Sequence, residues 1–120
     1  MTCIFCNIKE VILENNLAFA FYDKFPVNKG HLLIIPKRHV EEYFELTNEE
    51  RTAIDVLLME GKTLLDKTYE PDGYNIGINC GKAAGQTVFH VHVHLIPRYN
   101  GDMEDPRGGV RGVIPKKRIY

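Results

Sequence analysis

Three histidines alternate with valines near the end of the chain, in the sequence VFHVHVH. On a β-strand, side chains two residues apart share a face, so His90, His92 and His94 project together while Val91 and Val93 project into the opposite face. Imidazole near pH 7 serves as a nucleophile, a proton carrier or a metal ligand. The pattern predicts a strand with an apolar core face and a histidine-lined functional face; a merely solvated face is the simpler alternative.

The spacing argues against one metal ion shared by all three histidines. At a rise of ~3.3 Å per residue, His90 and His94 start about 13 Å apart. Zinc holds its nitrogen ligands at about 2.1 Å, so the three rings do not converge on one ion. Neighbours such as His90 and His92 could still chelate together. The three histidines are therefore expected to do different work.

A loop with the sequence NCGKAAGQT precedes the histidines. Its glycines, Gly81 and Gly85, let the backbone approach a ligand closely and expose successive N–H groups, which can hold an anion. Gln86 and Thr87 add side-chain donors. The loop is not a Walker loop, because no Gly-Lys-Ser/Thr sequence opens a helix. It predicts an anion site next to the histidines.

Strand and helix patterns alternate along the rest of the chain. Alternating or β-rich segments predict strands at residues 17–23, 31–36, 74–79 and 88–97. Thr47 with Glu50 three residues later forms a capping box, and apolar residues then recur at helical spacing until EPDG. One long helix among strands predicts an α+β domain around a mainly antiparallel sheet rather than a doubly wound parallel fold.

Composition limits the class of protein. The chain has 120 residues, is 44% hydrophobic and carries a formal net charge of -1. A single domain over residues 1–120 is expected, with no nucleic-acid or membrane partner, because no global field attracts polyanions. No apolar run approaches the ~20 residues of a membrane span, and MTCIFCNIKE does not resemble a secretory signal. A cytoplasmic location is expected.

The pair Cys3 and Cys6 has three readings: a structural zinc site, a redox pair, or two small buried residues. A disulfide framework is disfavoured in the cytosol, and no helix begins at Cys3 to lower a thiol pKa. A closed zinc site needs four nitrogen or sulfur ligands. The candidate nitrogen ligands are His31, His39, His90, His92 and His94. Cys80 is isolated and reads as a small, partly buried side chain.

Three separated motifs resemble the histidine triad (HIT) family. HVHVHLI resembles its signature, FYDKFPVNKGHLLIIPKRH its ribose-binding strand, turn and strand, and NCGKAAGQTVFH its phosphate loop. The resemblance implies a homodimer whose subunits have a five-stranded antiparallel sheet, one long helix and a short N-terminal helical segment. It also implies binding of purine nucleotides such as AMP, or of adenylated small molecules, and nucleotide hydrolase or nucleotidyl transferase activity.

The resemblance implies a role for each residue that matches a family motif. His92 matches the nucleophile, which would attack the α-phosphorus and form a covalent nucleotidyl-histidine while a carbonyl of the neighbouring strand fixes its tautomer. His94 would contact the transferring phosphate and assist the leaving group. Gly85, Gln86 and Thr87 would hold the phosphate oxygens as charge develops.

Four further residues match nucleotide contacts of the family. Asp23 would accept hydrogen bonds from the ribose hydroxyls, and Asn79 would lie near the phosphate and ribose. Phe19 and Ile8 would contact the base. Without the resemblance, Asp23 and Asn79 would read as turn residues.

The resemblance also selects among the readings of the cysteine pair. It implies a structural zinc ion bound by Cys3, Cys6, His39 and His90. His31 is left as a packed or hydrogen-bonded histidine at a strand start. Catalytic zinc at the triad is a weaker alternative.

The sequence thus predicts a hydrolase that cleaves at the α-phosphate of a nucleoside phosphoramidate or a dinucleoside polyphosphate. The alternative is a zinc-stabilised nucleotide-binding module or sensor with negligible turnover. The tail, residues 99–120, is expected to complete the site on the leaving-group side or to form part of the dimer surface.

Overall fold

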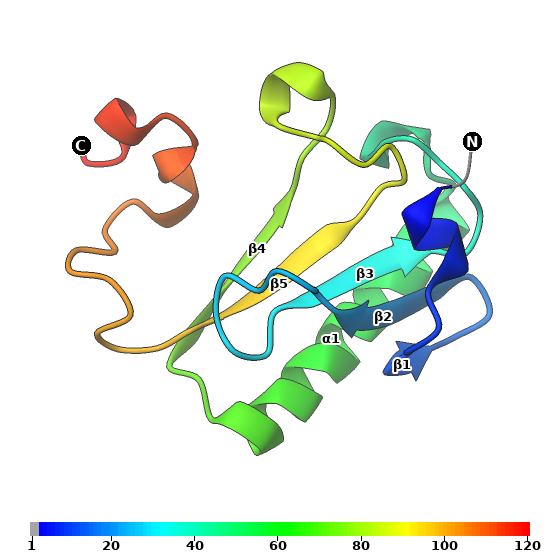
Figure 1. Ribbon diagram of the computed structural model, residues 1–120, viewed down its shortest axis with the longest axis horizontal. Helices are drawn as coiled ribbons and strands as arrows, with labels where there is room; N and C mark the ends of the chain where they lie inside the picture. Colours follow the sequence, from blue (N-terminus) through cyan, green and yellow to red (C-terminus); the bar gives the residue numbers. More distant parts are fainter. Residues whose placement is uncertain (1–2) are drawn as a thin grey trace.

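Five antiparallel strands form one sheet, and a long helix covers one of its faces (Figure 1). The computed structural model describes residues 3–120. In spatial order the strands are β1 (Leu13–Glu14), β2 (Ala18–Tyr22), β3 (Leu32–Pro36), β5 (Val93–Arg98) and β4 (Gly73–Ile78). The predicted α+β fold is confirmed.

The long helix α1 (Asn48–Tyr69) begins where the capping box predicts. The Thr47 hydroxyl accepts a hydrogen bond from the Glu50 amide at 3.1 Å, and the Glu50 carboxylate accepts one from the Thr47 amide at 2.9 Å. The buried Glu50 also pairs with Arg38 at 2.8 Å, which lowers the pKa of Glu50 to about 2. Side-chain bonds therefore satisfy amides that the first helical turn leaves without partners.

The main core lies between α1 and the sheet. Its buried apolar residues come from the helix, the central strands and the segment before β5; they include Ala18, Ile34, Val40, Ile54, Leu57, Val91 and Val93. At Gly61 the helix approaches the sheet closely, because a Cβ there would lie 3.2 Å from side-chain atoms of Leu32 and Leu95. Any larger side chain would push α1 away from the strands.

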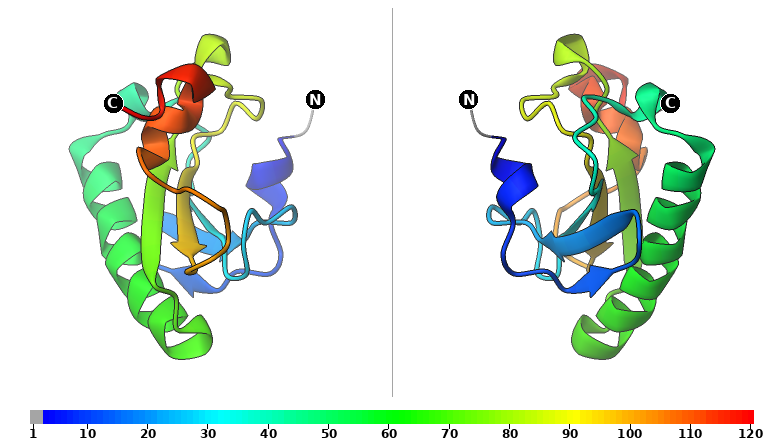
Figure 2. Two further views of the ribbon diagram at one scale, coloured as in Figure 1. Left: turned by 90° about the vertical axis from the view of Figure 1, so that its left-hand side faces the viewer. Right: turned by 90° about the vertical axis from the view of Figure 1, so that its right-hand side faces the viewer.

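A second, aromatic cluster covers part of the opposite face. Phe21, Leu33 and Ile35 pack there with Phe5, Ile8 and Phe19. Figure 2 shows the N-terminal turn η1 (Ile4–Asn7) on this side of the sheet, away from α1. Cross-strand pairing joins Phe21 to Leu33 and Leu33 to His94. Paired residues share a face, so His94 lies beside this aromatic cluster.

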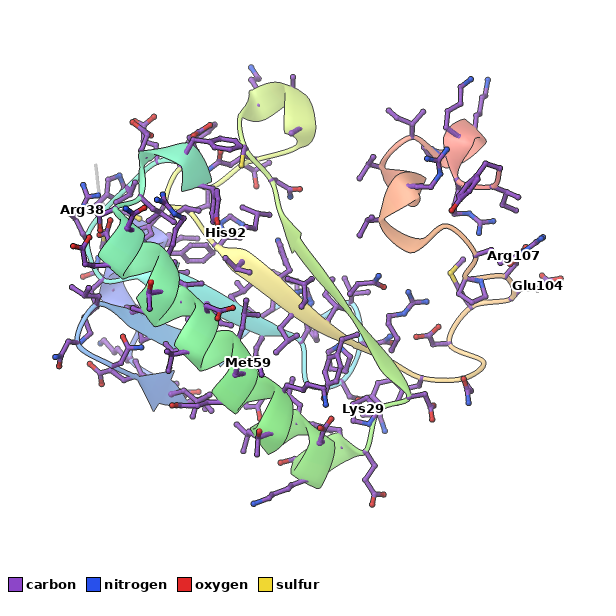
Figure 3. All side chains as sticks on the ribbon, turned by 180° about the vertical axis from the view of Figure 1, so that it is seen from behind. Lys29, Arg38, Met59, His92, Glu104 and Arg107 are labelled. Atoms are coloured by element: carbon purple, nitrogen blue, oxygen red, sulfur yellow. The ribbon has the colours of Figure 1, made fainter. Side chains whose placement is uncertain are left out.

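The tail leaves β5 and forms two short 3-10 turns, η4 (Gly109–Val113) and η5 (Pro115–Lys117), on the β4 side of the sheet (Figure 3). Of these turns, η4 contacts β4. The Arg118 side chain donates to the carbonyls of Asp105 at 2.7 Å and Arg107 at 2.6 Å, which ties the end of the tail to its beginning. Within residues 3–120, no helix has both the length and the apolar character that a membrane crossing requires.

Candidate active site and metal centre

The histidine segment is less regular than predicted. Strand β5 begins at Val93, so His90 and His92 precede it and only His94 lies within it. The Val91 amide donates to the carbonyl of Val40 at 2.8 Å, outside the sheet ladder. Val91 and Val93 are buried in the main core, as predicted. The valines therefore still face the core, although the regular strand starts later than predicted.

His90 is fully buried and turns toward the N-terminal cysteines. Its Nε2 atom lies 2.8 Å from the carbonyl oxygen of Pro36, so the neutral ring donates from Nε2 and directs the lone pair of Nδ1 the other way. That Nδ1 atom lies 3.4 Å from the sulfur atoms of both Cys3 and Cys6. The Cys6 sulfur also lies 3.4 Å from Nδ1 of His39.

The four predicted zinc ligands are thus brought together, with their ligand atoms within 4.8 Å of one another. In a tetrahedral zinc site, bonds of about 2.3 Å to sulfur and about 2.0–2.1 Å to nitrogen place sulfur and nitrogen about 3.6 Å apart. The observed sulfur–nitrogen distances of 3.4 Å fit that geometry. The Pro36 carbonyl supplies the outer hydrogen bond that metal-binding histidines usually make.

A backbone hydrogen bond selects one tautomer of the neutral His92 ring. Its Nδ1 atom lies 2.9 Å from the carbonyl oxygen of His90, so Nδ1–H donates there and Nε2 retains its lone pair. The prediction that a neighbouring strand supplies this carbonyl is wrong; it lies two residues back along the same segment. The ring of Phe5 packs edge-on against His92, with centroids 5.0 Å apart. Figure 3 labels His92 near the start of β5.

A chain of hydrogen bonds sets the proton of His94. The Val27 amide donates to Nδ1 of His31 at 3.0 Å, so a neutral His31 carries its proton on Nε2. That proton is donated to Nδ1 of His94 at 2.9 Å, which leaves the His94 proton on Nε2. Burial, followed by the neighbouring His92 and His31, lowers the pKa of His94 to about 4. At neutral pH His94 therefore offers an N–H donor.

His31 is the residue whose importance the sequence reasoning missed. It is buried between His94 and Asp23, with its Nε2 atom 3.5 Å from Asp23 Oδ2. The signal was available, because the turn at residues 25–30 brings Asp23 opposite His31, whose carbonyl accepts from the Asp23 amide at 2.9 Å. These three side chains contain metal-type donors. The proton on His31 Nε2 nevertheless withholds that atom from a metal, so the group is a hydrogen-bond chain.

The glycine loop has the backbone that its sequence predicts. Gly81 and Gly85 have φ values of 89° and 94°, which only glycine adopts readily. Gln86, however, is buried and binds the loop itself: its Oε1 accepts from the Gly81 amide at 2.8 Å, and its Nε2 donates to the carbonyls of Glu41 and Val88. Each polar atom of the Gln86 side chain thus has a partner inside the protein, and its contact with phosphate stays a prediction.

The other predicted nucleotide contacts share the histidine face or border it. Phe19 and Ile8 belong to the aromatic cluster. Asp23 uses Oδ1 to accept from the Phe25 amide at 2.9 Å, and its Oδ2 lies 3.5 Å from His31 Nε2. Asn79 lines a cavity next to His94, and Thr87 is exposed on the glycine loop. The site thus combines the aromatic cluster, a carboxylate, two oriented imidazoles and a glycine loop.

A model of the HIT domain matches residues 7–101 of the chain. The chain is 40% identical over 106 residues to the adenosine 5'-monophosphoramidase of Schizosaccharomyces pombe, covering 83% of this chain and 77% of that protein. It is 38% identical to a bis(5'-adenosyl)-triphosphatase of Dictyostelium discoideum, covering 80% and 64%. A zinc-bound histidine triad family protein of Mycobacterium smegmatis has a similar structure, with TM-score 0.78, 33% identity and coverage of 87% and 80%.

Proposed function

Because the chain belongs to the HIT domain family, we propose that it is a hydrolase that cleaves adenylated substrates at the α-phosphate through a covalent nucleotidyl-His92 intermediate. One observation supports this most directly: the Nδ1 atom of His92 lies 2.9 Å from the His90 carbonyl oxygen, so the neutral ring carries its proton on Nδ1 and its lone pair on Nε2. An imidazole in that tautomer is ready to act as a nucleophile without first losing a proton.

The nucleoside is proposed to lie over the aromatic cluster on β2 and β3. Phe19 and Ile8 supply an apolar surface for a base, and the carboxylate of Asp23 is placed to accept hydrogen bonds from ribose hydroxyls. This placement brings the α-phosphate to His92 and His94. The amides of Gly85 and Gln86 donate to carbonyls within the glycine loop, so the exposed Thr87 is the proposed donor to the phosphate oxygens.

The chemical step is a double displacement. The lone pair of His92 Nε2 forms a bond to phosphorus, the bond to the leaving group breaks, and the leaving atom keeps the electron pair and takes a proton from solvent. His94 Nε2–H donates to the phosphate or to the departing atom. Water then attacks phosphorus, the phosphorus–nitrogen bond breaks, its electrons return to His92, and the proton of the water is released.

The cysteine–histidine cluster is proposed to bind a structural zinc ion through Cys3, Cys6, His39 and His90. The ion would link the N-terminal turn to the segment before β5. The neighbour in Mycobacterium smegmatis is described as zinc-bound, which supports this assignment. The chain itself holds the His90 ring through the Pro36 carbonyl, and the carbonyl of His90 orients the ring of His92.

A homodimer is proposed to form along β4. Ile76 points to the helix side of the sheet, as its partner Leu95 does, yet it is 53% exposed. Among the described residues, no strand pairs with the outer edge of β4. Light scattering tests this: Ile76→Lys should yield monomer, whereas Val11→Lys, beside the opposite sheet edge, should leave the wild-type mass unchanged.

The proposed function is tested by trapping the intermediate. Wild-type protein is mixed with adenosine 5'-phosphoramidate, quenched in alkali, which preserves a phosphorus–nitrogen bond to histidine, and digested for mass spectrometry. An AMP adduct on the peptide containing His92 is expected, together with loss of turnover by at least about 10³-fold in His92→Asn. Tight AMP binding without adduct or turnover of any adenylated substrate would instead support a nucleotide sensor.

A further inference from the structure

The turn at residues 25–30 carries the backbone amide that orients His31. The Val27 side chain is 66% exposed, so its packing does little to hold that amide in place. The carbonyl of Asn28 accepts from the His31 amide at 3.2 Å, which closes the turn. The position of the Val27 amide therefore depends on what holds its neighbour Asn28.

Asn28 ties the turn to the end of β5. Its side-chain amide donates to the carbonyl of Pro97 at 3.1 Å and to Oδ2 of Asp102 at 2.8 Å. An asparagine amide has two donor hydrogens, so both are used. Beside it, the Tyr99 hydroxyl donates to the carbonyl of Lys29 at 2.7 Å. The turn is thus attached to the segment that ends β5 and follows it.

Asp102 is a fixed partner for Asn28. Arg98 donates to it twice, from Nε to Oδ2 at 2.8 Å and from Nη2 to Oδ1 at 2.9 Å, and the Tyr99 amide donates to Oδ2 at 3.0 Å. The bonds from Arg98, followed by that from the Tyr99 amide, hold the pKa of Asp102 well below its usual value. Paired charged bonds of this kind define geometry as well as adding strength. The place of the Asn28 amide is therefore set by β5.

The two ends of β5 meet through this turn. The Val27 amide donates to Nδ1 of His31 at 3.0 Å, and Nε2 of His31 lies 2.9 Å from Nδ1 of His94. His94 lies near the start of β5, and Arg98, which holds Asp102, is its last residue. One end of the strand thus positions the turn that orients the histidine near its other end.

We infer that Asn28 and Asp102 are positioning residues of the proposed hydrolase: their hydrogen bond holds the turn so that the Val27 amide meets His31 and His94 keeps its proton on Nε2. The inference rests on the proposed function, in which His94 donates that proton to the phosphate or to the departing atom. Asn28 and Asp102 act on the reaction through His31 and His94.

The test begins with Asn28→Asp, which removes both donor hydrogens and places a second carboxylate against Asp102. The kcat for adenosine 5'-phosphoramidate should fall by at least about tenfold, because a well-placed proton donor contributes about 10²-fold or more. The affinity for AMP should change little. Long-range ¹H–¹⁵N spectra of the histidine rings at pH 7 should show His94 protonated on Nε2 in the wild type and partly on Nδ1 in the variant.

The exchange variant Asn28→Asp with Asp102→Asn restores a donor and an acceptor in reversed order, so it should recover most of the kcat and the wild-type spectrum of His94. Asn100→Asp is the matched control. It makes the same substitution in the segment after β5, where Asn100 is exposed and within residues 3–120 bonds only through its backbone amide, to Asp72. It should behave as wild type.

Asn28→Ala removes the donors without adding charge and should act in the same direction with a smaller effect, which keeps the test usable if circular dichroism shows that Asn28→Asp does not fold. A His94 that keeps its proton on Nε2 in every folded Asn28 variant would overturn the inference, whatever the kcat. An exchange variant that fails to restore the His94 spectrum would also overturn it. Absence of turnover and of the His92 adduct in the wild type would overturn the hydrolase alone, since the spectra report on His94 without substrate.

Discussion

The Nδ1 atom of His92 lies 2.9 Å from the carbonyl oxygen of His90, whose side chain faces Cys3 and Cys6. His90, whose carbonyl orients the proposed nucleophile His92, is therefore also a member of the metal-type cluster. A change in the position of His90 should therefore move the carbonyl that holds His92, without passing through the rest of the fold.

Loss of a cluster ligand should remove the metal. Cys6→Ser is expected to lower the zinc content, measured by elemental analysis of protein purified without chelators, from about one ion per chain to much less. The melting temperature should fall by several degrees, because metal binding stabilises the folded chain. Cys80→Ser is the control and should keep its metal, since Cys80 lies outside the cluster. Full zinc content in Cys6→Ser would rule out the proposed ligand set.

Phe5 should support the position of His92. It lies between the two cysteines in η1, and its ring packs edge-on against His92 at 5.0 Å and against Phe21 at 5.5 Å. Phe5→Leu is expected to lower kcat by roughly tenfold, the scale of a small misplacement of a reacting group, with KM little changed. Phe25→Leu is the control, because Phe25 is 84% exposed. A rise in KM at constant kcat would show that Phe5 contacts the base instead.

Gln86 should contribute to stability rather than to phosphate binding. Gln86→Glu keeps the shape but removes the donor that serves the carbonyls of Glu41 and Val88. The free energy of unfolding should fall by about 2–4 kcal/mol, because buried acceptors lose their partner. Urea denaturation measures this, with the exposed Thr87→Ala as control. Unchanged stability combined with weaker AMP binding would restore the phosphate role predicted from sequence.

Acid should destabilise the protein through His94. Burial lowers the pKa of His94 from 6.5 to about 4, so between these values the unfolded chain binds more protons than the folded one. The free energy of unfolding should fall by roughly 2–3 kcal/mol as the pH drops through that window, and this contribution is fully present above pH 6.5. Urea denaturation at pH 7 and pH 4.5 should show a smaller loss in His94→Gln. Equal losses in both proteins would contradict the assignment.

Local features were predictable from sequence because neighbouring residues determine them. The capping box of Thr47 and Glu50 fixed the start of α1, and the positive φ values of Gly81 and Gly85 followed from residue type. The opposite faces of His94 and Val93 followed from strand alternation.

Features that depend on distant pairing were harder to predict. His31 meets His94 across 63 residues of sequence, a contact set by the register of β3 against β5. The late start of β5 also involves distant residues, since the ring of His90 contacts the sulfur of Cys3 and the carbonyl of Pro36. Gln86 carried a further ambiguity: an amide suits an anion and a loop carbonyl equally, and only burial distinguishes them.

The amide of Val27 sets the direction of the hydrogen bond from His31 to His94. One backbone hydrogen determines that His94 offers an N–H donor at Nε2. A proline at this position would have no such hydrogen. Both rings could then reverse together, and His94 would meet the phosphate oxygens with a lone pair, a repulsive contact in place of an attractive one. A turn residue thus sets the polarity of the two histidines through its backbone amide.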